Sequence, residues 1–289
     1  MENFEDKHAF LVMSRTVDAN LLNLLKSIDY KDNDIYLHID KKANVKNFNS
    51  KLEHAELILC QNISVGWAAD TLIKAEMILL KTAVNSGKKY SYLHLMSGND
   101  LQIVDNVQFR KFFKNTDEQY IDYESIDEPI NMRRIKYFFP LQQYTGKKHG
   151  LLWAMQKILM YIQVMLRINR LRKSPYKHIA KGSAWFSITL ECAQYIVKKE
   201  KEIEKYFYHG SAADELFIQT LILSSKFESK IASNNLRYIK WSEGANSPEV
   251  LKISNYEDLI ASQKLFARKF DTKIDSLVIS KILGEAHNG

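Results

Sequence analysis

The chain has 289 residues, of which 46% are hydrophobic and 11% aromatic, so it can bury a large core and need not be disordered. Its first eight residues are acidic and polar, whereas a signal peptide would carry a basic start and an apolar run, so export is not expected. Cys60 and Cys192 lack metal or redox spacing and fit the reduced thiols of a cytosolic protein.

The net charge of +7 is concentrated in one stretch of the chain. No Asp or Glu lies between Glu128 and Glu191, and this interval holds twelve Lys or Arg residues. The remainder, with 29 basic and 34 acidic residues, is slightly acidic. The stretch therefore predicts a partner rich in phosphate or anionic lipid.

Strand and helix patterns alternate from the N-terminus onward. Strands are expected at 8–13, 35–40, 57–59, 90–96 and 185–189, and helices at 17–28, 70–84, 107–113, 190–204 and from Glu215. This order predicts an α/β fold with a twisted, mostly parallel sheet, helices on both faces and a site at the carboxyl ends of the strands. No tract resembles a linker, so a single domain over 1–289 is expected.

The basic stretch includes an expected helical insertion at about 145–178. Residues 151–173 predict an apolar helix that becomes basic at its end, and polar residues interrupt it well short of the roughly 20 apolar residues that a bilayer-spanning helix needs. Two interpretations stay open: a helix lying on anionic lipid, or a core helix whose basic end is solvated. The Met and aromatic pattern alone favours the core helix.

Several polar or aromatic residues follow strands or turns where substrates bind in such sheets. Asp40 is placed to bind a ribose or base, or to form a turn. Asp100 would reach a sugar hydroxyl, or cap the helix at 107–113. Trp185, after the turn at Gly182, suits stacking on a sugar ring and equally suits a core strand.

A carboxylate and a later basic pair indicate group transfer from a diphosphate. Asp214 and Glu215 stand at an expected helix start, where capping and solvation would also explain them. The apolar residues after Glu215 predict a half-buried turn that raises a carboxyl pKa. Arg268 and Lys269, between two Phe residues, offer two cations for a leaving diphosphate without a metal.

No convincing metal site is predicted. The single D-x-D pattern, Asp32 to Asp34, precedes the second strand and so lies at the edge of the sheet opposite to the expected site. No zinc-type His and Cys spacing occurs either. We therefore expect no metal and no cofactor.

With these residues in place, the chain resembles the core-2/I-branching β-1,6-N-acetylglucosaminyltransferase and peptide O-xylosyltransferase family, glycosyltransferase family 14. The likeness covers nearly the whole length through short motifs whose order and spacing are specific. They include the segments 9–12, 34–42, 65–67, 95–100, 182–186, 213–215, 236–241, 247–248 and 265–271.

The resemblance implies a GT-A-like, Rossmann-like fold and an inverting transfer that needs no metal. It implies that Glu215 is the catalytic base, that Asp40 binds uridine, and that Lys269, with Arg268 beside it, binds the diphosphate. Lys252 is a substitute for a second diphosphate-binding Arg that has no clear match. Trp67, Asp100, Trp185 and Asp214 are the candidate substrate-binding residues.

Departures from the family pattern narrow the expected activity. Ala184 stands where the xylosyltransferases place an Asp, so xylosyl transfer to peptide is not expected. The disulfides and membrane anchor of animal members have no counterpart, which points to a cytoplasmic bacterial member.

The expected reaction moves GlcNAc from a UDP-sugar to a hydroxyl of a lipid-linked capsular or exopolysaccharide repeat unit, with the enzyme peripheral on the inner face of the plasma membrane. Another donor such as UDP-galactose is the alternative within the same mechanism. A basic nucleic-acid-binding protein is the alternative from another class, although no nucleic-acid-binding motif supports it.

Overall fold

The computed structural model describes residues 7–45, 48, 51–146, 150–245 and 247–286. Its main sheet has the strand order β3-β2-β1-β4-β8. The strands are β1 (His8–Ser14), β2 (Asn33–Ile39), β3 (Glu56–Leu59), β4 (Tyr92–Ser97) and β8 (Ser187–Thr189). The first four run parallel and β8 is antiparallel to β4, so the expected mostly parallel α/β sheet is confirmed.

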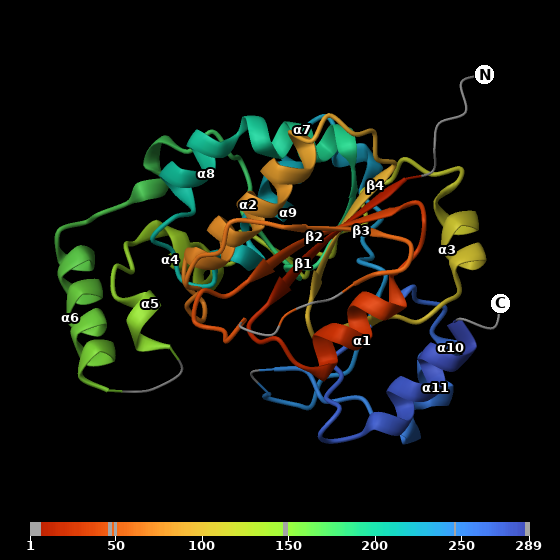
Figure 1. The fold of residues 1–289 in the computed structure, drawn as a ribbon. Coiled ribbons are helices and arrows are strands. Elements are labelled where there is room, and N and C mark those ends of the chain that lie inside the picture. The colour runs from red at the N-terminus through yellow and green to blue at the C-terminus, as the bar shows by residue number, and fades with distance from the viewer. Residues whose placement is uncertain (1–6, 46–47, 49–50, 147–149, 246, 287–289) are drawn as a thin grey trace.

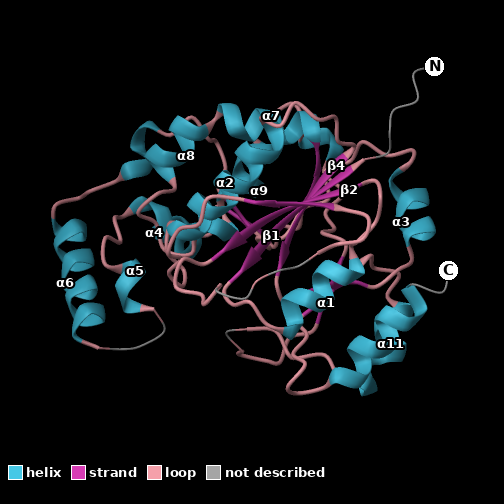
Figure 2. Cartoon of the chain, in the orientation of Figure 1, coloured by secondary structure: helices cyan, strands magenta, loops and turns pink. Residues whose placement is uncertain are grey.

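Helices cover both faces of this sheet (Figures 1 and 2). Alternate residues of β1 serve the two faces: Ala9 and Leu11 join the core under α2, α7 and α9, whereas Phe10 and Val12 join the core under α1, α3 and α11. The bounds are α1 (Ala19–Ser27), α2 (Thr71–Val84), α3 (Asn106–Phe113), α7 (Leu190–Lys198), α8 (Glu200–Tyr206), α9 (Phe217–Leu223), α10 (Tyr256–Ala261) and α11 (Ser276–Ala286). Burial on both faces explains the apolar run at residues 9–13 of β1, whereas β2 also buries Asn33, Asp34 and His38.

Local signals set several boundaries differently from the sequence prediction. The expected helix at 190–204 is two helices, α7 and α8, which meet at Lys199. The cap of α3 is Asp105, whose side chain accepts from the backbone N–H of Gln108, so Asp100 does not cap it. Glu215 does not begin a helix: it ends the 3-10 turn η2 (Ala213–Glu215), and α9 begins at Phe217.

A small second sheet brings the C-terminal part of the chain to the end of β4. It has the order β5-β10-β9, from β5 (Asp100–Gln102), β10 (Phe266–Arg268) and β9 (Arg237–Ile239). The antiparallel register of β10 on β5 sets Arg268 opposite Asp100. The remaining strands, β6 (Ser125–Ile126) and β7 (Ala180–Lys181), pair with each other.

The basic stretch forms helices at one side of the sheet. They are α4 (Pro129–Lys136), α5 (Gln142–Thr145), α6 (Leu151–Met165) and the 3-10 turn η1 (Arg170–Lys173). In Figure 1, α6 stands at the rim of the molecule, beside α5 and away from the sheet. Residues 147–149 of the expected insertion lie outside the described part of the chain.

The burial pattern of α6 is inverted. Its buried side chains are Gln156 and Gln163, whose side-chain oxygens accept from the backbone N–H groups of Leu141 and Phe138. Most of its apolar side chains are exposed instead, with Leu151 79% and Met165 69% exposed. The core-helix interpretation is therefore wrong, because the buried side chains of α6 are the two glutamines, which hydrogen-bond to the backbone of the 138–141 segment. No helix in the described ranges combines the length and apolar character needed to cross a bilayer.

Candidate active site

A cavity of about 330 Å³ opens at the carboxyl ends of β1, β2 and β4. We call it the strand-end cavity. Its walls include Ser14, Asp40 and Ser97 from these strand ends, together with Trp67, Trp185 and Arg268. Gly98 permits the close approach of β4 to β1, because a Cβ at this position would collide with the Ser14 side chain. The site thus lies at the sheet edge that the topology favours.

Arg268 is the largely buried cation of the strand-end cavity, whose lining also includes the exposed Arg15. Its guanidinium lies 4.0 Å from the ring centre of Trp185, and its Nε is 3.2 Å from Oδ1 of Asp100. Burial lowers the pKa of Arg268, and the Asp100 carboxylate opposes this shift. The side chain is 14% exposed, which leaves this charge beside open space.

Asp100 lies behind Arg268 and is 1% exposed. Its carboxylate accepts from the backbone N–H of Ser97 at 2.9 Å and from the Ser97 hydroxyl at 2.7 Å. These contacts with Ser97 and Arg268 orient the guanidinium, which differs from the sugar contact expected for Asp100. Trp185 lies in the cavity wall as expected, and its ring stacks on Arg268.

Asp40 follows β2 and is buried at the edge of the strand-end cavity. Its carboxylate accepts from the backbone N–H of Lys42 at 2.8 Å and of Val65 at 3.1 Å, which fixes the loop before Trp67. His38, two residues earlier, also lines the cavity, and burial lowers its pKa while Asp40 opposes the shift. Sequence reasoning missed His38, although its place in the same strand was the available signal.

A backbone hydrogen bond joins the segments that carry Lys269 and Lys252. The carbonyl of Lys269 accepts from the N–H of Leu251 at 2.9 Å, and its Nζ donates to the Ser247 hydroxyl at 3.2 Å. Lys252 is exposed and near Asp275, whose pKa is lowered first by the N–H of Ile253 and in smaller part by Lys252. Arg268 lines the strand-end cavity, whereas neither Lys269 nor Lys252 is among the described residues of its lining.

Glu215 forms an ion pair with Arg134 of α4. Nη2 of Arg134 lies 2.7 Å from Oε2 of Glu215, and the same guanidinium donates to the carbonyls of Ser211 and Ala212. The carboxylate is 40% exposed. Sequence reasoning missed Arg134, because its partner lies 81 positions away in the chain.

Two backbone contacts tie the Glu215 turn to the strand-end cavity. The N–H of Ala212 donates to the carbonyl of Ala68 at 2.7 Å, beside Trp67, and the N–H of Gly182 donates to the carbonyl of Glu215 at 2.9 Å, three residues before Trp185. A Cβ at Gly182 would overlap the Asp122 carbonyl, so this approach requires glycine. Glu215 itself is outside the cavity lining formed by the described residues.

The acid with a raised pKa in this turn is Asp214. Burial, and then the charge of Glu215, raise the pKa of Asp214 to about 7, while Arg134 opposes the shift. Oδ1 of Asp214 is buried without a hydrogen-bond partner. Glu76 of α2 is also buried, and burial and Asp214 raise its pKa well above the usual range. Asp214 is thus a buried acid whose pKa depends on the neighbouring carboxylate of Glu215.

The raised pKa of Asp214 predicts a pH-dependent stability. Between about pH 4 and pH 7 the folded protein holds a proton on Asp214 that the unfolded chain has lost, so the free energy of unfolding falls as pH rises through this window. Asp214→Asn should make the fall of the unfolding free energy with pH less steep. A smaller fall should remain, because the pKa of Glu76 is also raised. Urea unfolding from pH 5 to pH 8 measures it, with exposed Asp258→Asn as control; an unchanged slope in Asp214→Asn would contradict the assignment.

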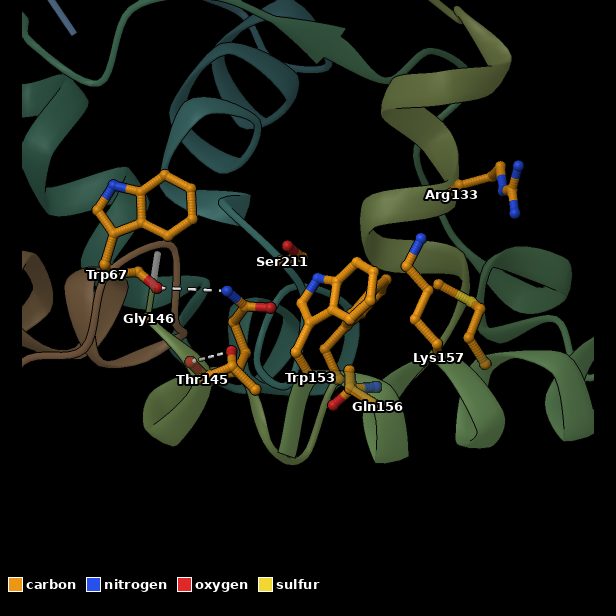
Figure 3. A pocket seen from close by; sticks show the side chains of 11 residues that line it. Trp67, Arg133, Thr145, Gly146, Trp153, Gln156, Lys157 and Ser211 are labelled. Carbon is orange, nitrogen blue, oxygen red and sulfur yellow. Dashed lines mark hydrogen bonds between the residues drawn. The ribbon is translucent and has the colours of Figure 1, made fainter. Parts of the chain in front are cut away.

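A second cavity of about 530 Å³ lies between the Trp67 loop and α6, and we call it the tryptophan pocket (Figure 3). Its walls include Trp67, Trp153, Arg133, Lys157 and Ser211. Because Trp67 lines both cavities, the tryptophan pocket adjoins the strand-end cavity. Sequence reasoning assigned no role to Arg133, Trp153 or Lys157, which come together only when α6 packs beside α4 and α5.

The D-x-D acid Asp34 lies near the start of β2, at the opposite edge from the strand-end cavity. Its carboxylate is paired with Lys7 at 3.0 Å and Lys88 at 2.8 Å, and it accepts from the Tyr90 hydroxyl at 2.6 Å. Asp34 is thus a structural acid, as its position predicted. Within the described part of the chain, no group of three or more His, Cys, Asp or Glu side chains is arranged to hold a metal ion; the prediction that no metal is needed stays a prediction.

A mostly parallel α/β sheet with a polar cavity at its carboxyl edge is consistent with a GT-A-like glycosyltransferase fold. The chain belongs to the Core-2/I-Branching enzyme family, whose model matches residues 8–261. It is therefore a glycosyltransferase of family 14, as the motifs in the sequence indicated.

Distant relatives agree with this assignment. The chain is 21% identical to the beta-glucuronosyltransferase GlcAT14C of Arabidopsis thaliana over 98% of its own length and 76% of the relative. It is 23% identical to the xylosyltransferase sqv-6 of Caenorhabditis briggsae over 89% of its length, and 20% identical to xylosyltransferase 2 of Rattus norvegicus over 93%. It spans about one third of these two xylosyltransferases, 34% and 32%.

Proposed function

We propose that this glycosyltransferase moves a sugar from a UDP-sugar to a hydroxyl of a glycan acceptor, with inversion and without a metal. The observation that carries the proposal is the placement of Arg268, held between Asp100 and Trp185, in the cavity at the carboxyl edge of the sheet. A fixed cation at this edge supports binding of an anionic donor.

The proposed step uses Glu215 as the general base. Glu215 takes the proton of the acceptor hydroxyl. At the same time, the oxygen of that hydroxyl bonds to the anomeric carbon on the face opposite UDP. The bond between the anomeric carbon and the diphosphate oxygen breaks, and UDP leaves with that electron pair. Arg134, 2.7 Å from Glu215, holds the carboxylate in place.

Protein cations replace a metal in this proposal. Arg268, with Lys269 next to it in the chain, stabilises the charge that develops on the departing diphosphate. Asp40 and His38 lie at the side of the strand-end cavity where we place the nucleoside. Lys252 stays the proposed second contact for the diphosphate. The hydrogen bond from the Leu251 N–H to the Lys269 carbonyl holds the Lys252 segment beside that of Lys269.

The donor sugar that we propose is GlcNAc, from the resemblance to the branching enzymes. UDP-galactose is the alternative within the same fold and mechanism, and the glucuronosyl and xylosyl relatives keep other donors open. Donor hydrolysis across a panel of UDP-sugars distinguishes them.

Ligand-induced thermal stabilisation tests the proposed class. We expect UDP to raise the melting temperature in the presence of excess EDTA, because a ligand that binds only the folded state stabilises it. Duplex DNA should leave the melting temperature unchanged. Stabilisation by DNA with a steep salt dependence would favour the nucleic-acid alternative instead, and UDP binding that requires manganese would exclude the metal-free clamp.

The acceptor that we propose is a lipid-linked polysaccharide repeat unit at the inner face of the plasma membrane. The outward face of α6 supports this location, because Leu151, Met155, Ile158, Ile162 and Met165 follow one another at helical spacing and all are exposed. Exposed Arg167, Arg172 and Lys173 follow the helix, which suits anionic lipid headgroups.

Vesicle sedimentation measures this contact. The protein should bind vesicles rich in phosphatidylglycerol more strongly than neutral phosphatidylcholine vesicles, and salt should weaken the binding. Replacing Met155, Ile158 and Ile162 with Ser should release it, whereas Leu277→Ser, an exposed apolar residue of α11, is the control. Binding that ignores both salt and lipid charge would contradict the membrane location, and a concentration-dependent dimer lost in the triple variant would assign the face to a second copy.

A further inference from the structure

The tryptophan pocket combines aromatic faces with positive charge. Trp67 and Trp153 stand on either side of it, and Lys157 and Arg133 lie beyond Trp153 (Figure 3). Nζ of Lys157 is 4.7 Å from the Trp153 ring centre. Of the described residues that line the pocket, none is acidic. Such walls favour a ligand that has both a flat apolar surface and negative charge.

We infer that the tryptophan pocket binds the acceptor, and that the group it recognises is a sugar ring bearing an anionic substituent. The apolar faces of sugar rings stack on indole, and a phosphate or carboxylate is bound by a Lys point charge and an Arg fork. The volume of about 530 Å³ is of the size that holds a small ligand.

The location of the pocket suits an acceptor. Trp67 separates it from the strand-end cavity, and Ser211 in its wall lies four residues before Glu215. The hydrogen bond from Ala212 to Ala68 holds these two walls together. A sugar in the pocket therefore has its hydroxyls near the proposed base, so this inference rests on the proposed function.

The helix α6 has one face toward the pocket and another toward solvent. Trp153, Gln156, Lys157 and Met160 line the pocket, while the exposed apolar side chains point outward. Gln156 is committed to the protein, since its side-chain oxygen accepts from the N–H of Leu141 at 2.9 Å. Recognition then falls to Trp153 and Lys157, with Arg133 contributed by α4.

Calorimetric titration of the UDP-saturated protein tests the inference, because UDP occupies the strand-end cavity and leaves the pocket open. The probes are GlcNAc 1-phosphate, GlcNAc, glucuronic acid and inorganic phosphate. We expect GlcNAc 1-phosphate to bind more tightly than either GlcNAc or inorganic phosphate alone. If glucuronic acid binds instead, the anionic-sugar site stands and its anion is a carboxylate.

Three variants and one control identify the walls that act. Lys157→Ala and Arg133→Ala should each weaken the anionic sugar about tenfold, the loss of one charged contact, and Trp153→Ala should weaken every sugar probe. Arg172→Ala, an exposed cation outside the pocket lining, should bind like wild type. Wild-type affinity in all three variants, or equal binding of inorganic phosphate and sugar phosphate, would overturn the inference. Loss of UDP binding in the wild type would count against the proposed function instead.

Discussion

Glu215→Gln should lower the rate of sugar transfer on the order of a thousandfold and leave UDP affinity unchanged. Glutamine keeps the shape of the side chain and a hydrogen-bond partner for the acceptor, but it cannot take the hydroxyl proton, and proton transfer by a placed base is worth roughly a hundredfold to ten-thousandfold. Turnover is followed as UDP release with a glycan acceptor present, and UDP affinity by calorimetry.

The contacts of Glu215 make this variant suitable for the test. Its carboxylate is 40% exposed and paired with Arg134, so loss of the charge should cost at most about 1 kcal/mol of stability. Glu191→Gln removes a carboxylate of α7 that is 63% exposed and paired with Lys226, and it should retain full turnover. Wild-type turnover by Glu215→Gln would remove Glu215 from the role of base.

The main sheet could be predicted because its signals are local. Strands buried on both faces carry apolar runs, as β1 does over residues 9–13, and the helices between them have apolar spacing. Once the strands are parallel, their carboxyl ends share an edge, so the position of Asp40 at the cavity follows from the order of elements alone.

Side-chain partners could not be predicted, because they join distant segments. Asp100 faces Arg268 only after β10 pairs with β5, and Arg134 faces Glu215 only after α4 packs against η2. A helical pattern also does not say which face is buried. In α6 the glutamines bond to the backbone of the 138–141 segment, and these hydrogen bonds override the expectation that Leu, Ile and Met face inward.

Arg268→Gln should lower turnover on the order of a hundredfold or more, with a smaller loss of UDP affinity. A cation aimed at the leaving diphosphate gains strength as charge develops, so its removal affects the transition state more than the bound donor. Because the buried Asp100 would lose its counter-ion, the variant should also be less stable by a few kcal/mol.

Two further variants separate the loss of charge from the loss of stability. Asp100→Asn with Arg268→Gln removes both members of the ion pair and should recover stability but not turnover. Lys269→Ala leaves the ion pair between Asp100 and Arg268 in place, and should lower turnover without removing the counter-ion of Asp100. Lys273→Ala, an exposed cation four residues later, is the control. If the double variant regained turnover along with stability, Arg268 would be a structural partner of Asp100, and the charge that replaces a metal would have to come from elsewhere.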